Sequence, residues 1–161
     1  MPHNSPRLAV ILAALAISAF LWIPLPVQAQ GTITPMSLDE MHDMLASDEP
    51  LVVSLMTSWC GPCKNELVML NGMYAEFAEQ GLEFIGISLD IAPEQMAKML
   101  ENVPADFPFY WVGEVGLTEL EVNAVPQLYL VRDGGVYKKL VGLMDEEELR
   151  VLLVEMLEQK H

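Results

Sequence analysis

Hydrophobic and polar positions follow two different spacings along the chain, and these spacings predict its strands and helices. Two apolar runs of strand length, 51–56 and 82–89, contain one charged residue between them, so we expect strands buried on both faces. From Leu67 to Phe77, apolar residues recur every three or four positions, which predicts a helix with Gly81 at its C-cap. A helix between two neighbouring buried strands predicts a right-handed parallel crossover.

The flanking segments extend this pattern in both directions. Ser37 and Glu40 have the spacing of a capping box, which predicts the start of a short amphipathic helix over 38–45. Pro93 begins another predicted helix. The remaining expected elements are an aromatic segment at 107–112 that is either a short strand or irregular, a small helix over 115–122, a hairpin of strands 127–131 and 136–141, and an amphipathic helix over 146–159 capped by Asp145. The expected order is βαβ, a helical insert, then ββα.

The first 29 residues are apolar and carry one formal charge, that of Arg7. An apolar stretch over 8–23 is followed by small residues that fit cleavage after Ala29. We expect 1–29 to be a secretory signal peptide, with an uncleaved membrane anchor over 8–23 as the alternative. Residues 30–161 then form one domain that faces a periplasmic or other extracytoplasmic compartment, where disulfides persist.

The chain is strongly acidic. Its 23 Asp and Glu residues exceed its 8 Lys and Arg residues, which gives a formal net charge of −15. Such a charge repels the phosphates of nucleic acids and of anionic lipids, so nucleic acid is not an expected partner. It favours basic partners, or serves only to keep the protein soluble.

The only two cysteines lie in the segment Trp59-Cys60-Gly61-Pro62-Cys63. Positions i and i+3 at the start of a helix are close enough for a disulfide. Cys60 is expected at the helix start, where unpaired N–H groups and the helix dipole favour the thiolate over the thiol. Cys60 is therefore the predicted nucleophile, and Cys63 is placed to resolve the mixed disulfide that Cys60 forms.

A zinc site and a structural disulfide are the alternative uses of the cysteine pair. A zinc site needs about four ligands, and besides these two cysteines the chain offers only three histidines, two of them near its ends. A structural disulfide stabilises mainly by closing a long loop, whereas this one closes a very short loop. Methionine pairs at helical spacing are expected to be core residues and not copper ligands. No metal and no cofactor is expected.

The element order and the Cys60-x-x-Cys63 motif resemble the thioredoxin-like superfamily, over nearly all of residues 36–159. The resemblance implies an α/β thioredoxin fold, a central mixed β-sheet flanked by helices, with an N-terminal helix and a helical insert after the second strand. The export signal, the long insert and Glu66 resemble the exported thiol-disulfide oxidoreductases of the TlpA/ResA kind. These proteins commonly carry a proline two positions after that glutamate, where this chain has Val68.

The resemblance also implies roles for individual residues. The Val125–Pro126 bond is expected to be cis and to lie beside the sulfurs, where its backbone would pair with an extended substrate. Trp59 is expected to flank the same groove, with core packing as the alternative, and Gly61 and Pro62 would complete it. Ser54 occupies the position where related proteins often carry a buried acid. Glu66 is then the remaining acid for the proton of Cys63, with a solvated surface glutamate as the alternative.

The expected function is reduction of disulfides in exported proteins, with apocytochrome c as one candidate target and a membrane thiol-disulfide protein as electron donor. Gly61 and Pro62 resemble the residues between the cysteines of reducing members, whereas strong oxidants usually carry a histidine there. Two alternatives remain open from the sequence: a thiol oxidase that donates disulfides, and a non-catalytic module that binds extended segments beside Pro126.

Overall fold

The computed structural model describes residues 33–158, so the predicted signal peptide at 1–29 lies outside the described residues. The described chain forms a six-stranded mixed sheet with the strand order β1-β4-β3-β2-β5-β6. The strands are β1 (Thr34–Pro35), β2 (Leu51–Met56), β3 (Glu83–Ser88), β4 (Phe109–Trp111), β5 (Gln127–Arg132) and β6 (Gly135–Val141). Strands β1, β4, β3 and β2 run parallel to one another, β5 pairs antiparallel with β2, and β6 pairs antiparallel with β5.

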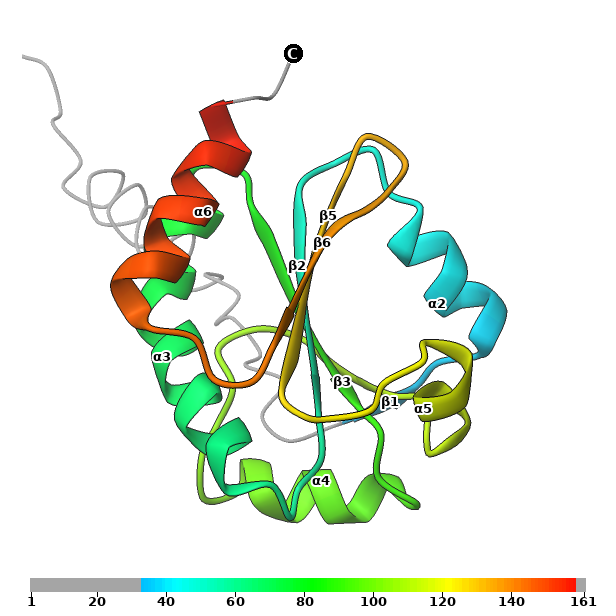
Figure 1. The fold of residues 1–161 in the computed structure, drawn as a ribbon. Coiled ribbons are helices and arrows are strands. Elements are labelled where there is room, and N and C mark those ends of the chain that lie inside the picture. The colour runs from blue at the N-terminus through cyan, green and yellow to red at the C-terminus, as the bar shows by residue number, and fades with distance from the viewer. Residues whose placement is uncertain (1–32, 159–161) are drawn as a thin grey trace, which may run out of the picture.

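Helices cover both faces of the sheet (Figure 1). Their bounds are α2 (Leu38–Leu45), α3 (Gly61–Ala78), α4 (Pro93–Leu100), α5 (Val115–Glu119) and α6 (Glu146–Glu158). Figure 1 shows α3 and α6 on one face of the sheet and α2 and α5 on the other. Each face has its own hydrophobic core, one built around Leu67 and Phe77 and the other around Met41 and Tyr129.

Local sequence signals account for most helix starts and ends. Ser37 and Glu40 form both hydrogen bonds of the predicted capping box. Asp145 Oδ1 accepts hydrogen bonds from the N–H groups of the first turn of α6, as expected for a cap. The helix α3 ends three residues before Gly81, which was predicted as its C-cap; the cap is Glu79, and Gly81 takes the positive φ of 88° in the turn that follows.

The thioredoxin-like α/β architecture predicted from the sequence is confirmed, and β2, α3 and β3 lie in the segments predicted for them. The aromatic segment at 107–112 contains a short strand, β4, which pairs with β3. The strand β1 was not predicted, because two residues carry no periodic signal and their pairing with β4 comes from a distant part of the chain. The fold places the ends of β2 and β3 side by side, and the cysteine motif directly follows β2.

Candidate functional site

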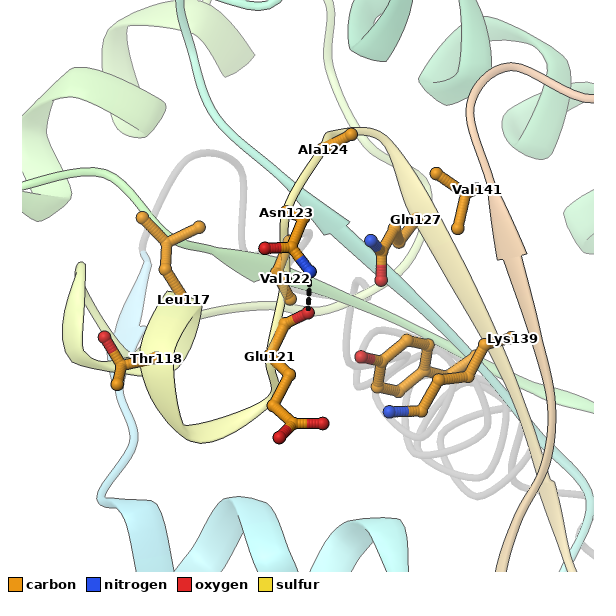
Figure 2. A pocket seen from close by; sticks show the side chains of 10 residues that line it. Leu117, Thr118, Glu121, Val122, Asn123, Ala124, Gln127, Lys139 and Val141 are labelled. Carbon is orange, nitrogen blue, oxygen red and sulfur yellow. Dashed lines mark hydrogen bonds between the residues drawn. The ribbon is translucent and has the colours of Figure 1, made fainter.

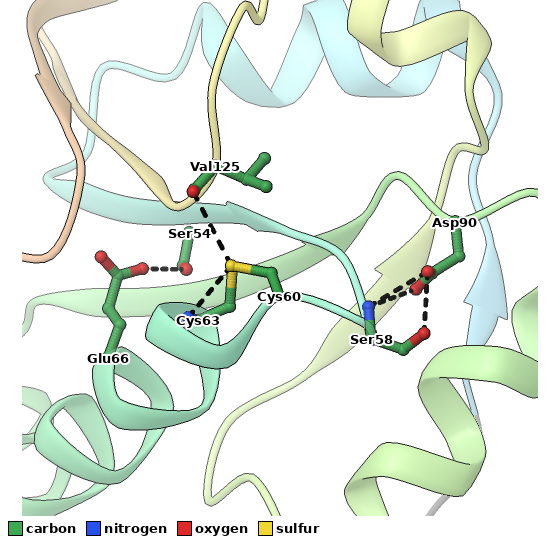
Figure 3. Close-up of a disulfide and its surroundings, with 7 residues drawn as sticks. All are labelled: Ser54, Ser58, Cys60, Cys63, Glu66, Asp90 and Val125. Atoms are coloured by element: carbon green, nitrogen blue, oxygen red, sulfur yellow. Dashed lines mark hydrogen bonds between the residues drawn. A yellow bond between two sulfur atoms is a disulfide. The ribbon is translucent and has the colours of Figure 1, made fainter.

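Cys60 and Cys63 form a disulfide at the start of α3, with their Cα atoms 5.3 Å apart (Figure 3). Cys60 is the N-cap residue of the helix, and Pro62 lies in the first turn, where its missing N–H group costs no hydrogen bond. The backbone N–H of Cys63 donates to Cys60 Sγ at 3.2 Å. A negative charge on Cys60 would therefore face a hydrogen-bond donor and the positive end of the helix dipole.

The two cysteines differ slightly in solvent exposure. Cys63 is completely buried, whereas Cys60 is 5% exposed. Gly61 and Pro62 between them are exposed, and the Trp59 side chain is 72% exposed, which excludes the alternative that Trp59 packs in the core. An incoming partner can thus approach Cys60 across an exposed rim, while it cannot reach Cys63 directly.

The Val125–Pro126 peptide bond is cis, as predicted, and it lies opposite the disulfide. The carbonyl oxygen of Val125 is 3.7 Å from Cys60 Sγ, and Figure 3 shows it pointing at that sulfur. Pro126 is buried, and its own carbonyl oxygen accepts a hydrogen bond from the N–H of Gly142. The loop before β5 is therefore held in place where its backbone borders the reactive sulfur.

Glu66 lies one turn after Cys63 on α3 and is completely buried, so the alternative of a solvated surface glutamate is wrong. Its Oε1 accepts a hydrogen bond of 2.7 Å from the hydroxyl of Ser54 on β2. Among residues 33–158, no group forms a hydrogen bond with its Oε2. Burial raises the pKa of Glu66 from 4.5 to about 7, although the hydrogen bond from Ser54 opposes the shift.

The pairing of Ser54 with Glu66 could not be predicted from the sequence alone. Ser54 was identified as a replacement for a buried acid, and Glu66 as a candidate acid, but nothing in their spacing shows that they are in contact. Sequence reasoning also missed Asp90, which is 2% exposed and accepts hydrogen bonds from Ser58, two residues before Cys60. An acid directly after a buried strand was the available signal, because it marks the sheet edge where β2 also ends.

An open pocket of about 860 Å³ lies beside the loop that carries the cis bond. Figure 2 shows the segment that follows α5 on one side of it and side chains of β5 and β6 on the other. Ala124 and Gln127, which flank the Val125–Pro126 bond, both line the pocket, as do Lys139 and Val141. The pocket is therefore continuous with the loop that borders Cys60.

In the part of the chain from 33 to 158, no group of three or more His, Cys, Asp or Glu side chains is arranged to hold a metal ion. None of the helices in this range has the length and apolar character needed to cross a membrane. The predicted methionine pairs lie in the cores, where Met41, Met73 and Met96 are completely buried.

A mixed sheet flanked by helices, a Cys-x-x-Cys pair at a helix start and a cis-proline loop opposite it together define the thioredoxin-like class of proteins. The chain belongs to the AhpC/TSA family, whose family model matches residues 25–136.

Relatives with assigned names point to the same class. Over 92 residues the chain is 24% identical to the thiol-disulfide oxidoreductase ResA of Oceanobacillus iheyensis, a match that covers 56% of this chain and 48% of ResA. The corresponding match to ResA of Bacillus cereus is 27% over 94 residues, covering 57% and 54%. The chain thus spans about half the length of these curated relatives.

Solved structures agree on the fold. A protein from Chlorobium tepidum, assigned as a thiol:disulfide interchange protein DsbE, superposes with a TM-score of 0.65 at 26% identity, covering 73% of this chain and 84% of that one. StoA from Bacillus subtilis superposes with a TM-score of 0.55 at 21% identity, covering 65% and 82%. Both structures support the predicted fold, and the matches to ResA and DsbE support the predicted similarity to oxidoreductases of the TlpA/ResA kind.

Proposed function

We propose that the protein is a thiol-disulfide oxidoreductase that reduces disulfides of other proteins through Cys60 and Cys63. The observation that carries the proposal is the position of Cys60, which caps α3, accepts a hydrogen bond from the Cys63 N–H and faces the Val125 carbonyl. Similarity to the named ResA and DsbE proteins supports the same reaction class.

The reaction starts from the reduced dithiol. The Cys60 thiolate attacks one sulfur of the substrate disulfide, which forms a mixed disulfide and releases one substrate thiolate that takes up a proton. The Cys63 thiol loses its proton and attacks Cys60 Sγ, so the mixed disulfide breaks and the second substrate thiolate leaves and is protonated. Two electrons pass to the substrate, and the protein ends as the Cys60–Cys63 disulfide. A donor dithiol must then reduce it.

Glu66 is the group that we assign to the proton of Cys63. It follows Cys63 by one helical turn, is buried with it, and has a pKa of about 7, so both its protonated and its ionised form are populated near neutral pH. The ionised carboxylate accepts the Cys63 proton, and the protonated acid can return a proton to the departing substrate thiolate. Ser54 holds the carboxyl in place through its hydroxyl.

The substrate class that fits the rim is an extended protein segment. Trp59, Gly61 and Pro62 offer an exposed surface on one side of Cys60, and the backbone of Val125–Pro126 borders it on the other.

The direction and the location of the reaction are part of the proposal. Gly61 and Pro62 between the cysteines support reduction, since no histidine is present there to stabilise the thiolate further. The apolar segment at 1–29 supports export to an extracytoplasmic compartment or anchoring there. Substrates would be exported proteins with disulfides, apocytochrome c among the candidates, and electrons would come from a membrane thiol-disulfide donor.

Trapping of the mixed disulfide tests the mechanism. In full-length Cys63→Ser protein the resolving thiol is absent, so a covalent adduct with a disulfide-bonded protein substrate should accumulate on non-reducing gels. The matched Cys60→Ser variant should form none. Adducts formed equally by both variants would contradict the assigned order of attack.

The reduction potential of the Cys60/Cys63 couple tests the direction. A value near or below roughly −230 mV, measured against glutathione or dithiothreitol buffers, is the result expected for a reductant. A value nearer roughly −120 mV would make the protein a disulfide donor instead. The non-catalytic binding module makes a different pair of predictions. The Cys60→Ala, Cys63→Ala double variant would still bind a substrate peptide, and the unaltered protein would show no turnover.

A further inference from the structure

Asp90 is a buried carboxyl group that the proposed reaction does not use. It lies two residues after the end of β3 and is 2% exposed. Because β2 and β3 are parallel neighbours, their carboxyl ends meet at the same edge of the sheet. Asp90 therefore faces the segment between β2 and Cys60.

The carboxylate joins this segment to β3 by several hydrogen bonds (Figure 3). The backbone N–H of Ser58 lies 3.0 Å from both Oδ1 and Oδ2, and the Ser58 hydroxyl donates to Oδ1 at 2.9 Å. On the β3 side, the Ser88 hydroxyl donates to Oδ2 at 3.0 Å. Both carboxylate oxygens thus have partners, and three of the four contacts come from Ser58.

The Asp90 backbone is itself held by the sheet. Its carbonyl oxygen accepts a hydrogen bond of 2.8 Å from Trp111 Nε1, and its N–H donates to the Ser88 hydroxyl at 3.3 Å. Trp111 belongs to β4, which pairs with β3 opposite Ser88. The Asp90 carboxylate is therefore fixed relative to the strands, and its hydrogen bonds hold Ser58 in a fixed position as well.

The residue that follows Ser58 is Trp59, whose side chain is 72% exposed and has little packing of its own to orient it. Cys60 comes next, and its N–H closes a turn by donating to the Thr57 carbonyl at 3.2 Å. The position of the Ser58 backbone thus decides where Trp59 projects and how the chain enters α3.

We propose that Asp90 is a positioning residue, which holds the turn formed by Thr57, Ser58 and Trp59 on the end of β3 so that Trp59 and Cys60 meet a protein substrate in one fixed orientation. The inference rests on the proposed function for its effect on substrates. Its structural part, the hold on the turn, stands independently of that function.

Four full-length variants separate this role from general stabilisation. Asp90→Ala removes the link, whereas Asp90→Asn keeps the shape, with an amide oxygen that can accept from the Ser58 N–H and an amide N–H₂ that can donate to a serine hydroxyl. Ser58→Ala removes one hydrogen bond on the turn side. Ser88→Ala is its control on the strand side, where it removes the hydroxyl that donates to Asp90 Oδ2 and accepts from the Asp90 N–H.

Each variant is first reduced and freed of reductant, and the second-order rate constant (kcat/KM) of its dithiol is then measured with insulin and with the small disulfide 5,5′-dithiobis(2-nitrobenzoic acid). We expect Asp90→Ala to lower kcat/KM for insulin about tenfold or more and for the small disulfide less than about threefold, since a small reagent needs only Cys60. Asp90→Asn should restore most of the insulin activity. Ser58→Ala should lower the ratio of the two activities, and Ser88→Ala should leave it unchanged.

Equal losses on both substrates, or undiminished insulin reduction by both Asp90→Ala and Ser58→Ala, would overturn the proposal. If Asp90→Ala does not fold, the comparison of Ser58→Ala with Ser88→Ala decides.

Amide hydrogen exchange separates a failure of this inference from a failure of the proposed function. In Asp90→Ala, or in Ser58→Ala if that variant alone folds, the backbone amide at position 58 should exchange faster than in the unaltered protein while the amides of β2 and β3 keep their rates. An unchanged rate at position 58 would overturn the positioning role. If the unaltered protein reduces neither disulfide, the proposed function fails, and the exchange rates alone decide on Asp90.

Discussion

Within the described part of the chain, the Glu66 carboxyl has one hydrogen bond, from Ser54, although it is completely buried. One hydroxyl cannot replace the water that an ionised carboxylate loses on burial, so the neutral acid is favoured until the pH approaches 7. The same imbalance has consequences for catalysis and for folding, and each consequence can be measured.

Replacement of Glu66 by Gln should slow the attack of Cys63, because the amide cannot accept its proton. We expect the rate of disulfide reduction to fall about 100-fold at neutral pH, within the range for loss of a general base. In the unaltered protein the rate should rise through pH 7, as Glu66 ionises, and this step should be missing in Glu66→Gln. Stopped-flow measurement of mixed-disulfide decay across pH 5.5–8.5 provides the profile, and a step that persists in Glu66→Gln would contradict the assignment.

The folding stability should respond to pH in the opposite sense. The pKa of Glu66 is about 7 in the folded protein and about 4.5 when unfolded, so between these values the folded state holds a proton that the unfolded state releases. Stability should therefore fall as the pH rises from about 4.5 to 7, by at most about 3 kcal/mol. Urea unfolding of the oxidised protein at several pH values tests this, with Glu66→Gln as the control that lacks the loss.

Single residues of the site differ in how far the sequence could reveal them. The cysteine pair was predictable because its function depends on a spacing of three residues within one helix. The contact of Ser54 with Glu66 joins a strand to a helix, and that of Ser58 with Asp90 spans 32 positions. The first contact depends on how α3 packs on β2 and the second on the register between β2 and β3, and no local pattern in the chain specifies either.

Elements were more predictable than their contacts, because apolar periodicity fixes a helix or a strand within a few residues. The pairing of β3 with β4 is an example of a contact that apolar periodicity does not predict. A Cβ added at Gly86 on β3 would meet the ring of Phe109 on β4, so a glycine is needed there for close approach. The Phe109 ring also stacks on Phe107, which ties the start of β4 into the core.

Two alanine substitutions for glycine should therefore have opposite effects. Gly86→Ala should destabilise the fold by about 1–3 kcal/mol, because the Phe109 ring must move in a packed core. Gly72→Ala, on an exposed position of α3 with open space around it, should stabilise by about 0.5–1 kcal/mol through better helix propensity. Thermal unfolding measures both, and a Gly86→Ala protein as stable as the parent would contradict the close approach.

At the scale of the whole molecule, the net charge of −15 acts on every encounter with a partner. A uniform excess of acid attracts basic polypeptides and repels acidic ones over distances of about a Debye length, roughly 10 Å at 0.1 M salt. The charge therefore adds a preference among substrates that the geometry around Cys60 does not provide.

Two disulfide peptides that differ only in flanking charge test this preference. The peptide with flanking lysines should be reduced with a higher kcat/KM than the one with flanking glutamates, and the difference should shrink about fivefold or more between 20 and 200 mM salt. Salt should change kcat little, because it acts on encounter and not on chemistry. Equal rates for the two peptides at low salt would mean that the acidic charge does not select substrates and serves only to keep the protein soluble.

The two sulfurs also belong to the larger hydrophobic core, in one cluster with Leu67, Met73 and Phe77. Folding and oxidation therefore form a closed thermodynamic cycle. The free energy of folding that the protein gains when the disulfide closes equals, in energy units, the difference in reduction potential between the unfolded and the folded chain. A core substitution that stabilises one redox form more than the other must change the reduction potential by the same difference in free energy. Core packing around α3 is thus a means of tuning electron transfer without touching either cysteine.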